Sequence, residues 1–243
     1  MLGNSIDILS TNVKWICALD NVINNGNRVC SRDLECIEIT ADLIVTEIEK
    51  PVVTIKERKL GYKFMETEAT WMLGGRNDIF HPNMAKYSDD GKTLYGAYGP
   101  PIIEQIDYVL KSLTKDENTR QAVLTIWRQN PPVTKDTPCT LSMQFMIRDN
   151  KLDMFVNMRS SDIWLGVPYD TFSFSCVALQ VLHKLNFTGH KEYSAGKLYN
   201  YAASRHLYKT DFEKALAVLR CRYEEITTTD VLERMIAKIK DGL

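Results

Sequence analysis

The chain has 243 residues, of which 44% are apolar, and this is enough for one sizeable hydrophobic core or two small ones. Its 30 Lys and Arg residues nearly balance its 31 Asp and Glu residues, and no basic tract is present, which argues against nucleic acid as a partner. A mononucleotide is compatible with this balance because it needs only a few well-placed cations.

The sequence carries no evident targeting or membrane signal. Met1 to Ser5 has neither the basic start nor the apolar core of a secretion signal, and no run approaches the ~18 apolar residues of a membrane span. We therefore expect a cytoplasmic protein without membrane association. No repeat or linker divides the chain, so we predict a single α+β domain over residues 1–243. The six cysteines include no Cys-x-x-Cys pair, and we expect most to be reduced and buried.

In chain order, the first predicted element is a strand from Glu35 to Ile44, where apolar and polar residues partly alternate. Apolar residues at helical spacing then predict a helix between Ile102 and Leu113. Gln121 to Trp127 has the composition of a second strand.

The clearest strand signal is a hairpin. Leu141 to Ile147 and Leu152 to Met158 are rich in apolar residues, and the segment 148–151 between them contains Asp and Asn, which suit a turn. Cys139 is therefore expected just before the first strand of the hairpin, and Arg159 just after the second.

Two further helices are predicted. Val177 to Leu185 is apolar almost all round and should be buried, whereas Val231 to Ile239 carries an apolar stripe. Asp230, with Glu233 three residues later, resembles a capping box at the start of the last helix.

Cys139 has two interpretations. A single cysteine is more often a small buried side chain than a nucleophile. The segment 157–170 changes this balance, because it places an Arg, two Ser, two Asp, a Gly and a Pro within fourteen residues after a strand. Arg159 and Ser160 suit a phosphate, and a nearby Arg also favours a thiolate. For Arg159 the alternative is a surface ion pair with one of the two Asp residues.

These residues carry a resemblance. Pro-Cys-Thr, the hairpin, and then Arg-Ser-x-Asp-x-x-Leu-Gly-x-Pro-Tyr-Asp resemble the thymidylate synthase superfamily, most closely its branch of deoxycytidylate and cytidylate 5-hydroxymethylases. The resemblance extends from about Arg32 to about Tyr208. It implies a mixed β-sheet packed by helices, a sheet-to-sheet homodimer, 5,10-methylenetetrahydrofolate as cosubstrate and no metal, in a bacterial or phage-infected host cell.

The resemblance assigns three catalytic side chains besides the base-recognising residue. Cys139 resembles the thiolate that adds to C6 of the pyrimidine and so activates C5. Glu68 resembles a carboxylate that orders water and relays protons, although a Glu in a helical segment is otherwise most often a solvated residue. Tyr98 resembles the tyrosine that assists proton removal at C5.

The phosphate ligands are also assigned by resemblance. Arg159 and Ser160 resemble two of them, and Arg32 resembles a third, from an N-terminal loop. Arg120 resembles the arginine that reaches the phosphate bound by the other subunit, which implies an obligate symmetric dimer. The usual second arginine of that pair is Gln121 here.

His206 and Tyr208 resemble the pair that hydrogen-bonds the sugar hydroxyl, although His206 alone is compatible with an ordinary structural histidine. The expected folate-binding residues are Asp162, Leu165, Gly166 and Tyr169.

Asp170 carries the prediction of the base, because thymidylate synthases have Asn at this position. A carboxylate accepts from the amino group of cytosine, and a proton shared with N3 completes the pair. Uracil would turn its O4 toward a lone pair of an ionised carboxylate. The sequence therefore favours a cytosine nucleotide, with ribose or deoxyribose.

The product depends on whether water or hydride reaches the transferred carbon. Thymidylate synthases cover this carbon with a tryptophan and a C-terminal tail; the corresponding segment from His81 to Tyr87 has no Trp, and no counterpart of the tail is evident. Thr140 also replaces the usual His after the cysteine. We therefore predict a (deoxy)cytidylate 5-hydroxymethylase. The alternatives are a C5 methylase, acting on cytidylate or on dUMP, and a catalytically silent binding protein.

Overall fold

A computed structural model describes residues 9–189, 191–226 and 230–243. The elements of this part of the chain are, in order, α1 (Thr11–Asn25), β1 (Asn27–Ser31), β2 (Leu34–Glu47), η2 (Lys56–Arg58), α2 (Tyr62–Leu73), η3 (Pro82–Tyr87), α3 (Gly99–Lys115), β3 (Val123–Thr125), β4 (Thr140–Arg148), β5 (Lys151–Met158), β6 (Ser161–Asp162), α4 (Val167–Thr188), β7 (Ser194–Tyr208), η4 (Lys209–Asp211), α5 (Phe212–Arg220) and α6 (Val231–Lys240).

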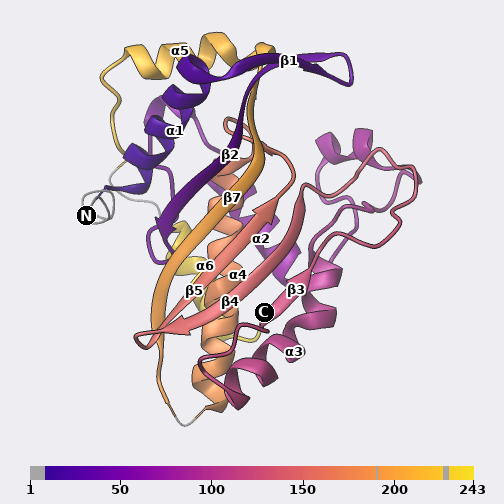
Figure 1. Cartoon of the computed structure of the whole chain (residues 1–243), viewed down its shortest axis with the longest axis vertical. Coiled ribbons are helices and arrows are strands. Elements are labelled where there is room, and N and C mark those ends of the chain that lie inside the picture. Colours follow the sequence, from indigo (N-terminus) through magenta and orange to yellow (C-terminus); the bar gives the residue numbers. More distant parts are fainter. Residues whose placement is uncertain (1–8, 190, 227–229) are drawn as a thin grey trace.

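Among the described residues, the strands form one mixed sheet in the order β1-β2-β7-β5-β4-β3, and β6 pairs with β7 (Figure 1). The β5–β7 and β6–β7 pairs are parallel, and the other neighbours are antiparallel. Between β5 and β7 the chain passes through α4, the type of crossover that a parallel pair requires. The predicted α+β class, with a mixed sheet packed by helices, is confirmed.

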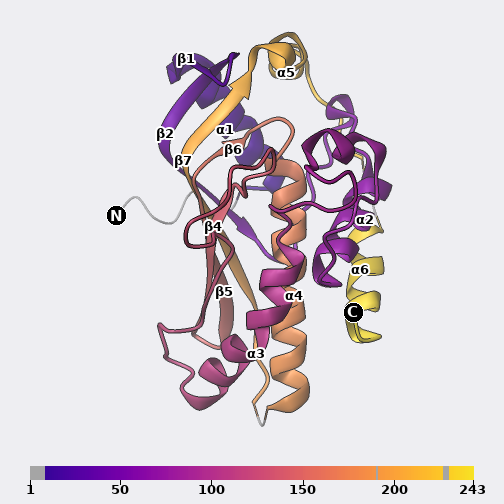
Figure 2. The same ribbon diagram turned by 90° about the vertical axis from the view of Figure 1, so that its right-hand side faces the viewer.

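The helices α2, α3, α4 and α6 lie on one side of the sheet (Figure 2). Of these, α4 packs directly on β5 and β7, and α6 lies against α2 and α4. Most side chains of α4 are buried, as the nearly uniform apolar character of Val177 to Leu185 predicts. The helix begins ten residues before that stretch, because Pro168 occupies its first turn, where proline is favourable.

The predicted hairpin is confirmed as β4 and β5. Arg148 pairs with Lys151, so the connection is a two-residue turn. Both turn residues, Asp149 and Asn150, have positive φ angles of 51° and 60°, which Asp and Asn adopt more readily than most residues. This tight turn fixes the register that brings Cys139 and Arg159 to the same end of the two strands.

Two other predicted elements are confirmed and one is shorter than expected. The strand Glu35 to Ile44 lies within β2, and the helix Ile102 to Leu113 lies within α3. The strand expected from Gln121 to Trp127 contains only Val123–Thr125. Its end is irregular because the N–H groups of Ile126 and Trp127 both donate to the carbonyl of Leu141.

Two expectations were wrong. The last helix begins after Asp230, but the Asp230 side chain makes no capping hydrogen bond and instead pairs with Arg234, one turn later. The cysteines are all free, yet Cys17, Cys30 and Cys221 are exposed, so most of the six are not buried. Sequence periodicity shows which residues can face a core, but not whether a short helix or an edge strand covers a particular thiol.

The face of the sheet opposite α4 carries apolar side chains that remain accessible. Leu43 and Tyr201, which pair across β2 and β7, are 53% and 38% exposed. On the same face the rings of Phe155 and Tyr199 stack with centroids 4.5 Å apart. No helix in the described part of the chain is long and apolar enough to cross a membrane.

Candidate active site

The loop before β4 holds Cys139 half-buried at the end of the hairpin. Arg159, which follows β5, fixes this loop: its N–H donates to the Cys139 carbonyl at 2.9 Å, and its guanidinium donates to the carbonyls of Pro138 and Thr137, each at 2.9 Å. The same guanidinium lies 3.9 Å from the Cys139 sulfur. Cys139 and Arg159 are therefore brought together as the sequence predicts.

The Cys139 thiol is surrounded by opposing charges. Burial raises its pKa, the guanidinium groups of Arg159 and Arg32 lower it, and Asp170 raises it again. Burial prevails, so the pKa lies above the ordinary value for a thiol. The two arginines stabilise the thiolate, but less than the loss of water around the buried sulfur destabilises it.

Tyr98 lies beside this thiol, just before α3. Its hydroxyl accepts a hydrogen bond from the N–H of Thr140 at 3.3 Å, and its ring stacks on Phe174 at 6.2 Å. Burial, with charge at Cys139 and Asp170, holds the pKa of the Tyr98 phenol well above its ordinary value. Tyr98 is therefore protonated at neutral pH and able to donate a proton or a hydrogen bond.

Asp170 lies in the first turn of α4. Its carboxylate Oδ2 is 3.2 Å from the position that a Cβ of Gly166 would occupy, so a side chain on Gly166 would crowd this carboxyl. Burial raises the pKa of Asp170 to about 7, with Arg205 lowering it and Asp162 raising it. Both protonation states of Asp170 are therefore populated at neutral pH.

Glu68 faces this group from α2, which packs against α4. Burial, with a contribution from Asp170, raises the pKa of Glu68 to about 8. Glu68 is half-buried rather than fully exposed, so its side chain is only partly open to solvent. Two neighbouring carboxyl groups with raised pKa values and a buried thiol are the expected components of a site for proton transfer.

The residues expected around the phosphate and sugar lie near this cluster. Arg32 occupies the turn of the β1–β2 hairpin with a φ of 51°. Its positive charge lowers the pKa values of both Cys139 and Tyr208. Burial raises the pKa of Tyr208, and Arg32 beside it lowers it. The rings of His206 and Tyr208 meet edge to face at 4.8 Å. Burial lowers the pKa of His206, which favours the neutral imidazole.

Ser160 and Arg120 differ in their location. Ser160 is half-buried between β5 and β6, next to Arg159. Arg120 is exposed, and its carbonyl accepts from the Gln144 side chain at 2.8 Å. Gln144 lies five residues beyond Cys139 along β4, a distance of about 17 Å at the usual rise of a strand. Within one subunit, Arg120 is therefore not brought to the thiol.

The loop 162–166 connects β6 to α4. Asp162 accepts hydrogen bonds from the N–H groups of Trp164 and Leu165 at 2.7 and 2.9 Å. Trp15 donates to the carbonyl of Ile163 at 2.8 Å, and Arg58 donates to the carbonyl of Trp164 at 2.6 Å.

Sequence patterns did not indicate Trp15 or Arg58, which hold this loop from α1 and η2. The one available signal was the occurrence of a Trp and an Arg in otherwise ordinary helical segments, which is too weak to assign a role. Leu165 within the loop is 55% exposed.

An aromatic cluster adjoins this loop. Phe64 on α2 contacts Tyr169, Phe80 and His81, with ring centroids 5.5, 5.7 and 5.3 Å apart. The Tyr169 hydroxyl accepts from the N–H of Gly61 at 3.1 Å. All four rings are partly exposed, and we call them the aromatic wall. An exposed aromatic surface beside Leu165 fits a flat heteroaromatic cosubstrate. Phe64 and Phe80 were not identified from the sequence.

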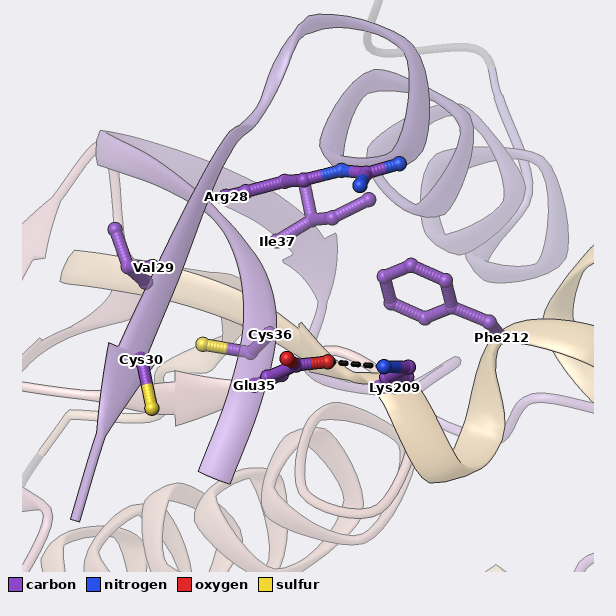
Figure 3. A pocket seen from close by; sticks show the side chains of 8 residues that line it. All are labelled: Arg28, Val29, Cys30, Glu35, Cys36, Ile37, Lys209 and Phe212. Carbon is purple, nitrogen blue, oxygen red and sulfur yellow. Dashed lines mark hydrogen bonds and ion pairs between the residues drawn. The ribbon is translucent and has the colours of Figure 1, made fainter. Parts of the chain in front are cut away.

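A cavity of about 430 Å³ lies between the β1–β2 hairpin and α5 (Figure 3). Arg28, Cys30 and Cys36 are among its lining residues, and an ion pair between Lys209 and Glu35 crosses one side. None of the predicted site residues lines this cavity. Within the described part of the chain, no group of three or more His, Cys, Asp and Glu residues is arranged to hold a metal ion.

The fold and the site together define a protein with a half-buried thiol beside an arginine, two neighbouring carboxyl groups and an adjoining aromatic surface on a mixed sheet. A family model described as thymidylate synthase matches residues 14–241. The chain belongs to the thymidylate synthase family.

Three relatives show the range of this similarity. The chain is 28% identical over 224 residues to a deoxyuridylate hydroxymethyltransferase of Bacillus phage SP01, covering 80% of this chain and 56% of the relative. It is 34% identical over 142 residues to a deoxyuridylate hydroxymethyltransferase of Pseudomonas phage M6, covering 53% and 39%. It is 28% identical over 171 residues to a thymidylate synthase of Pseudomonas fluorescens (strain SBW25), covering 58% and 61%. The chain thus spans about half the length of these relatives.

Proposed function

We propose that this chain is a folate-dependent 5-hydroxymethylase of a cytidine or deoxycytidine monophosphate. The observation that carries the proposal is the position of Asp170. This carboxyl group, in place of an amide, lies in the first turn of α4, close enough to Cys139, Tyr98 and Glu68 to raise their pKa values. The thiol supplies the shared first step of the family, and the carboxyl selects the base.

In the proposed reaction, the Cys139 sulfur adds to C6 of the pyrimidine, and C5 becomes nucleophilic. The thiol must first lose its proton, because burial keeps its pKa raised. Glu68, with a pKa of about 8, is suited to pass protons between the base and water at neutral pH. Tyr98, which is protonated and lies beside the sulfur, is proposed to hold by hydrogen bonding the water that takes the proton from C5.

Asp170 is assigned to the edge of the base that carries N3 and the 4-substituent. Its carboxyl oxygen accepts from the cytosine amino group, and a proton shared with N3 completes a two-point contact. Because the pKa of Asp170 is about 7, the proton needed for this contact is available at neutral pH. Protonation of N3 also stabilises the adduct that forms when the thiol adds to C6.

The sugar and phosphate are assigned to residues around the thiol. Arg159, Ser160 and Arg32 are proposed to bind the phosphate through charge-assisted hydrogen bonds. His206, neutral because burial lowers its pKa, and Tyr208 are proposed to bind the sugar hydroxyl.

Methylenetetrahydrofolate would supply the one-carbon unit at the oxidation level of formaldehyde. The residues proposed to hold it are Asp162, Leu165, Gly166 and Tyr169, next to the aromatic wall. After C5 has bonded to this carbon, loss of the C5 proton and cleavage of the bond from the carbon to the folate nitrogen would release tetrahydrofolate and leave an exocyclic methylene on C5. Water then adds to the methylene, and the bond between C6 and the Cys139 sulfur breaks. The segment from His81 to Tyr87 has no counterpart of the tryptophan that covers this carbon in thymidylate synthases, so it would leave more room for water.

A homodimer formed through the open face of the sheet is part of the proposal. The exposed Leu43 and Tyr201 and the stacked Phe155 and Tyr199 provide an apolar surface that favours burial. Arg120 contacts Gln144, which faces the same side of the sheet as Phe155. This location supports a role for Arg120 at the phosphate site of the partner subunit.

A second candidate is a 5-hydroxymethylase of deoxyuridine monophosphate. The two phage relatives carry that name, and a neutral Asp170 can donate to O4 of uracil while accepting from N3–H. An Asp170 with a pKa of about 7 is neutral in a large fraction of molecules, so this candidate has a specific basis.

The test is to incubate the protein with methylenetetrahydrofolate and dCMP, CMP or dUMP, and to weigh the nucleotide products. A product heavier than dCMP or CMP by CH2O supports the proposal. The same gain on dUMP alone favours the second candidate. A product heavier by CH2, with dihydrofolate formed in equal amount, contradicts hydroxymethylation.

A further inference from the structure

A fully buried arginine lies behind the base-recognising carboxyl. Arg205, on β7, has 0% exposure. Its guanidinium donates to Asp42 on β2 at 3.0 Å, to Ser161 on β6 at 2.5 Å and to the carbonyl of Asn200 at 3.0 Å. A buried charge is costly unless it is paired and hydrogen-bonded, and the contacts from three strands satisfy this requirement. The guanidinium is therefore fixed in place and remains charged at neutral pH.

The short segment that contacts Arg205 also contacts Asp170. Ser161 is followed directly by Asp162, whose carbonyl oxygen is 2.9 Å from the Cβ position of Gly166. The Oδ2 of Asp170 is 3.2 Å from the same position. The carboxyl of Asp170 and the backbone that directly follows the serine held by Arg205 therefore both approach this one position. Consistent with this arrangement, the charge of Arg205 lowers the pKa of Asp170, although burial raises it by more.

We propose that Arg205 is a positioning residue for base recognition: its fixed buried charge stabilises the ionised form of Asp170 and thereby favours a cytosine over a uracil nucleotide. This inference rests on the proposed function and extends it to a residue outside the contact with the base.

The selectivity follows from where one proton resides. Each base forms a two-point contact with Asp170 only if one proton is added to the pair of ionised carboxylate and neutral base. In the cytosine complex this proton can move to N3, which is basic, and Asp170 is then an ionised carboxylate. In the uracil complex O4 is far less basic, so the proton must stay on Asp170. A positive charge nearby stabilises the first arrangement and disfavours the second.

The other titratable groups around Asp170 have the opposite effect. Glu68 faces it from α2, Tyr98 from the start of α3, and Cys139 from the loop before β4. Asp162, on β6, also raises the pKa of Asp170. Each of these groups disfavours an ionised Asp170 when it is itself negatively charged. Arg205 supplies the positive charge that offsets them, and Asp42 on β2 partly neutralises Arg205.

The inference is tested by measuring the dissociation constants of dCMP and dUMP, without folate, from about pH 5 to about pH 9. In Arg205→Met we expect the preference for dCMP over dUMP to fall by about tenfold, since one pKa unit corresponds to a factor of ten. The pH at which dUMP binding is half lost should rise. Arg205→Lys retains the charge and should retain most of the preference, which separates charge from packing.

Asp42→Asn provides a test of the opposite sign that keeps Arg205. Removal of the Asp42 charge leaves Arg205 less neutralised, so the midpoint of dUMP binding should move to lower pH and the preference for dCMP should increase. If Arg205→Met does not fold, as judged by circular dichroism, this variant alone decides. Unchanged pH midpoints, or shifts in the same direction in both variants, would overturn the inference. Methylation, or turnover of dUMP alone, by the unmodified protein would instead refute the proposed function, and the opposite shifts in binding would still be measurable.

Discussion

The site has two sides that are built differently. The thiol side, formed by Cys139, Arg159 and Tyr98, is held by backbone hydrogen bonds at the ends of β4 and β5. The aromatic wall is held by ring contacts between α2, the two residues before η3, and α4. Hydrogen bonds to a sheet fix a reacting atom closely, whereas ring contacts tolerate replacement of one side chain by another of similar size. We infer that the first step of the reaction depends on the thiol side, and that the choice of product is made at the aromatic wall.

The largest effect is expected from Cys139→Ala. If the thiol side carries the shared first step, this variant should lose turnover by at least about 10⁴-fold, because no other group forms the covalent adduct. Release of tritium from C5 of the labelled nucleotide measures this loss. Cys17→Ala, which changes an exposed cysteine on α1, is the control and should retain activity. Substantial tritium release by Cys139→Ala would contradict the inference that the first step of the reaction depends on the thiol side.

Asp170→Asn should change the base preference. An amide donates to O4 and accepts from N3–H, so we expect the ratio of kcat/KM for dUMP to that for dCMP to rise by about 100-fold or more. Asp153→Asn is a suitable control because burial also raises the pKa of Asp153, which lies near the distant turn of the hairpin. A ratio that does not move in Asp170→Asn contradicts the role of Asp170 in base recognition.

Glu68→Gln should lower kcat by about 10²- to 10⁴-fold, as expected for loss of a proton-transfer group. It should also change the pH dependence of stability. The native pKa of Glu68 is about 8, above its unfolded value of 4.5, so its stabilising contribution is fully present below about pH 4.5 and is lost as pH rises to 8. Glu68→Gln should therefore raise the melting temperature relative to the unmodified protein at pH 8, but not at pH 4.

Glu66→Gln is the matched control on the same helix. Glu66 forms ion pairs with Arg234 and Lys238, each at 2.7 Å, and these outweigh burial and lower its pKa. Its contribution to stability is present at neutral pH and is lost as pH falls, so this variant should be less stable at pH 8 while retaining turnover. Equal pH dependence in the two variants would contradict the assignment of Glu68.

The smallest effect is expected at the aromatic wall. His81→Trp should increase the methylated fraction of the product by a few-fold, because a larger ring excludes water from the transferred carbon. Tyr87→Trp, at an exposed position at the end of the η3 helix that follows His81, serves as the control. Mass spectrometry of the nucleotide products gives the fraction directly. An unchanged product ratio would show that the aromatic wall does not set access of water.

The sequence predicted much of the sheet and the linear motifs, but not the contacts between distant segments. The β4–β5 hairpin was recognisable because its turn chemistry and apolar pattern are local. The role of Arg205 was not, since its partners Asp42 and Ser161 are separated from it by 163 and 44 residues. The raised pKa of Glu68 also escaped prediction, because it depends on the packing of α2 against α4 rather than on neighbouring residues.

Isotope labelling of the product tests the central claim most directly. The protein is incubated with dCMP and methylenetetrahydrofolate in water enriched in oxygen-18, and the nucleotide is isolated and weighed at an early time. We predict 5-hydroxymethyl-dCMP whose new hydroxyl carries the label, with tetrahydrofolate as the second product. A methylated nucleotide without the label, accompanied by dihydrofolate, would contradict hydroxymethylation by this chain.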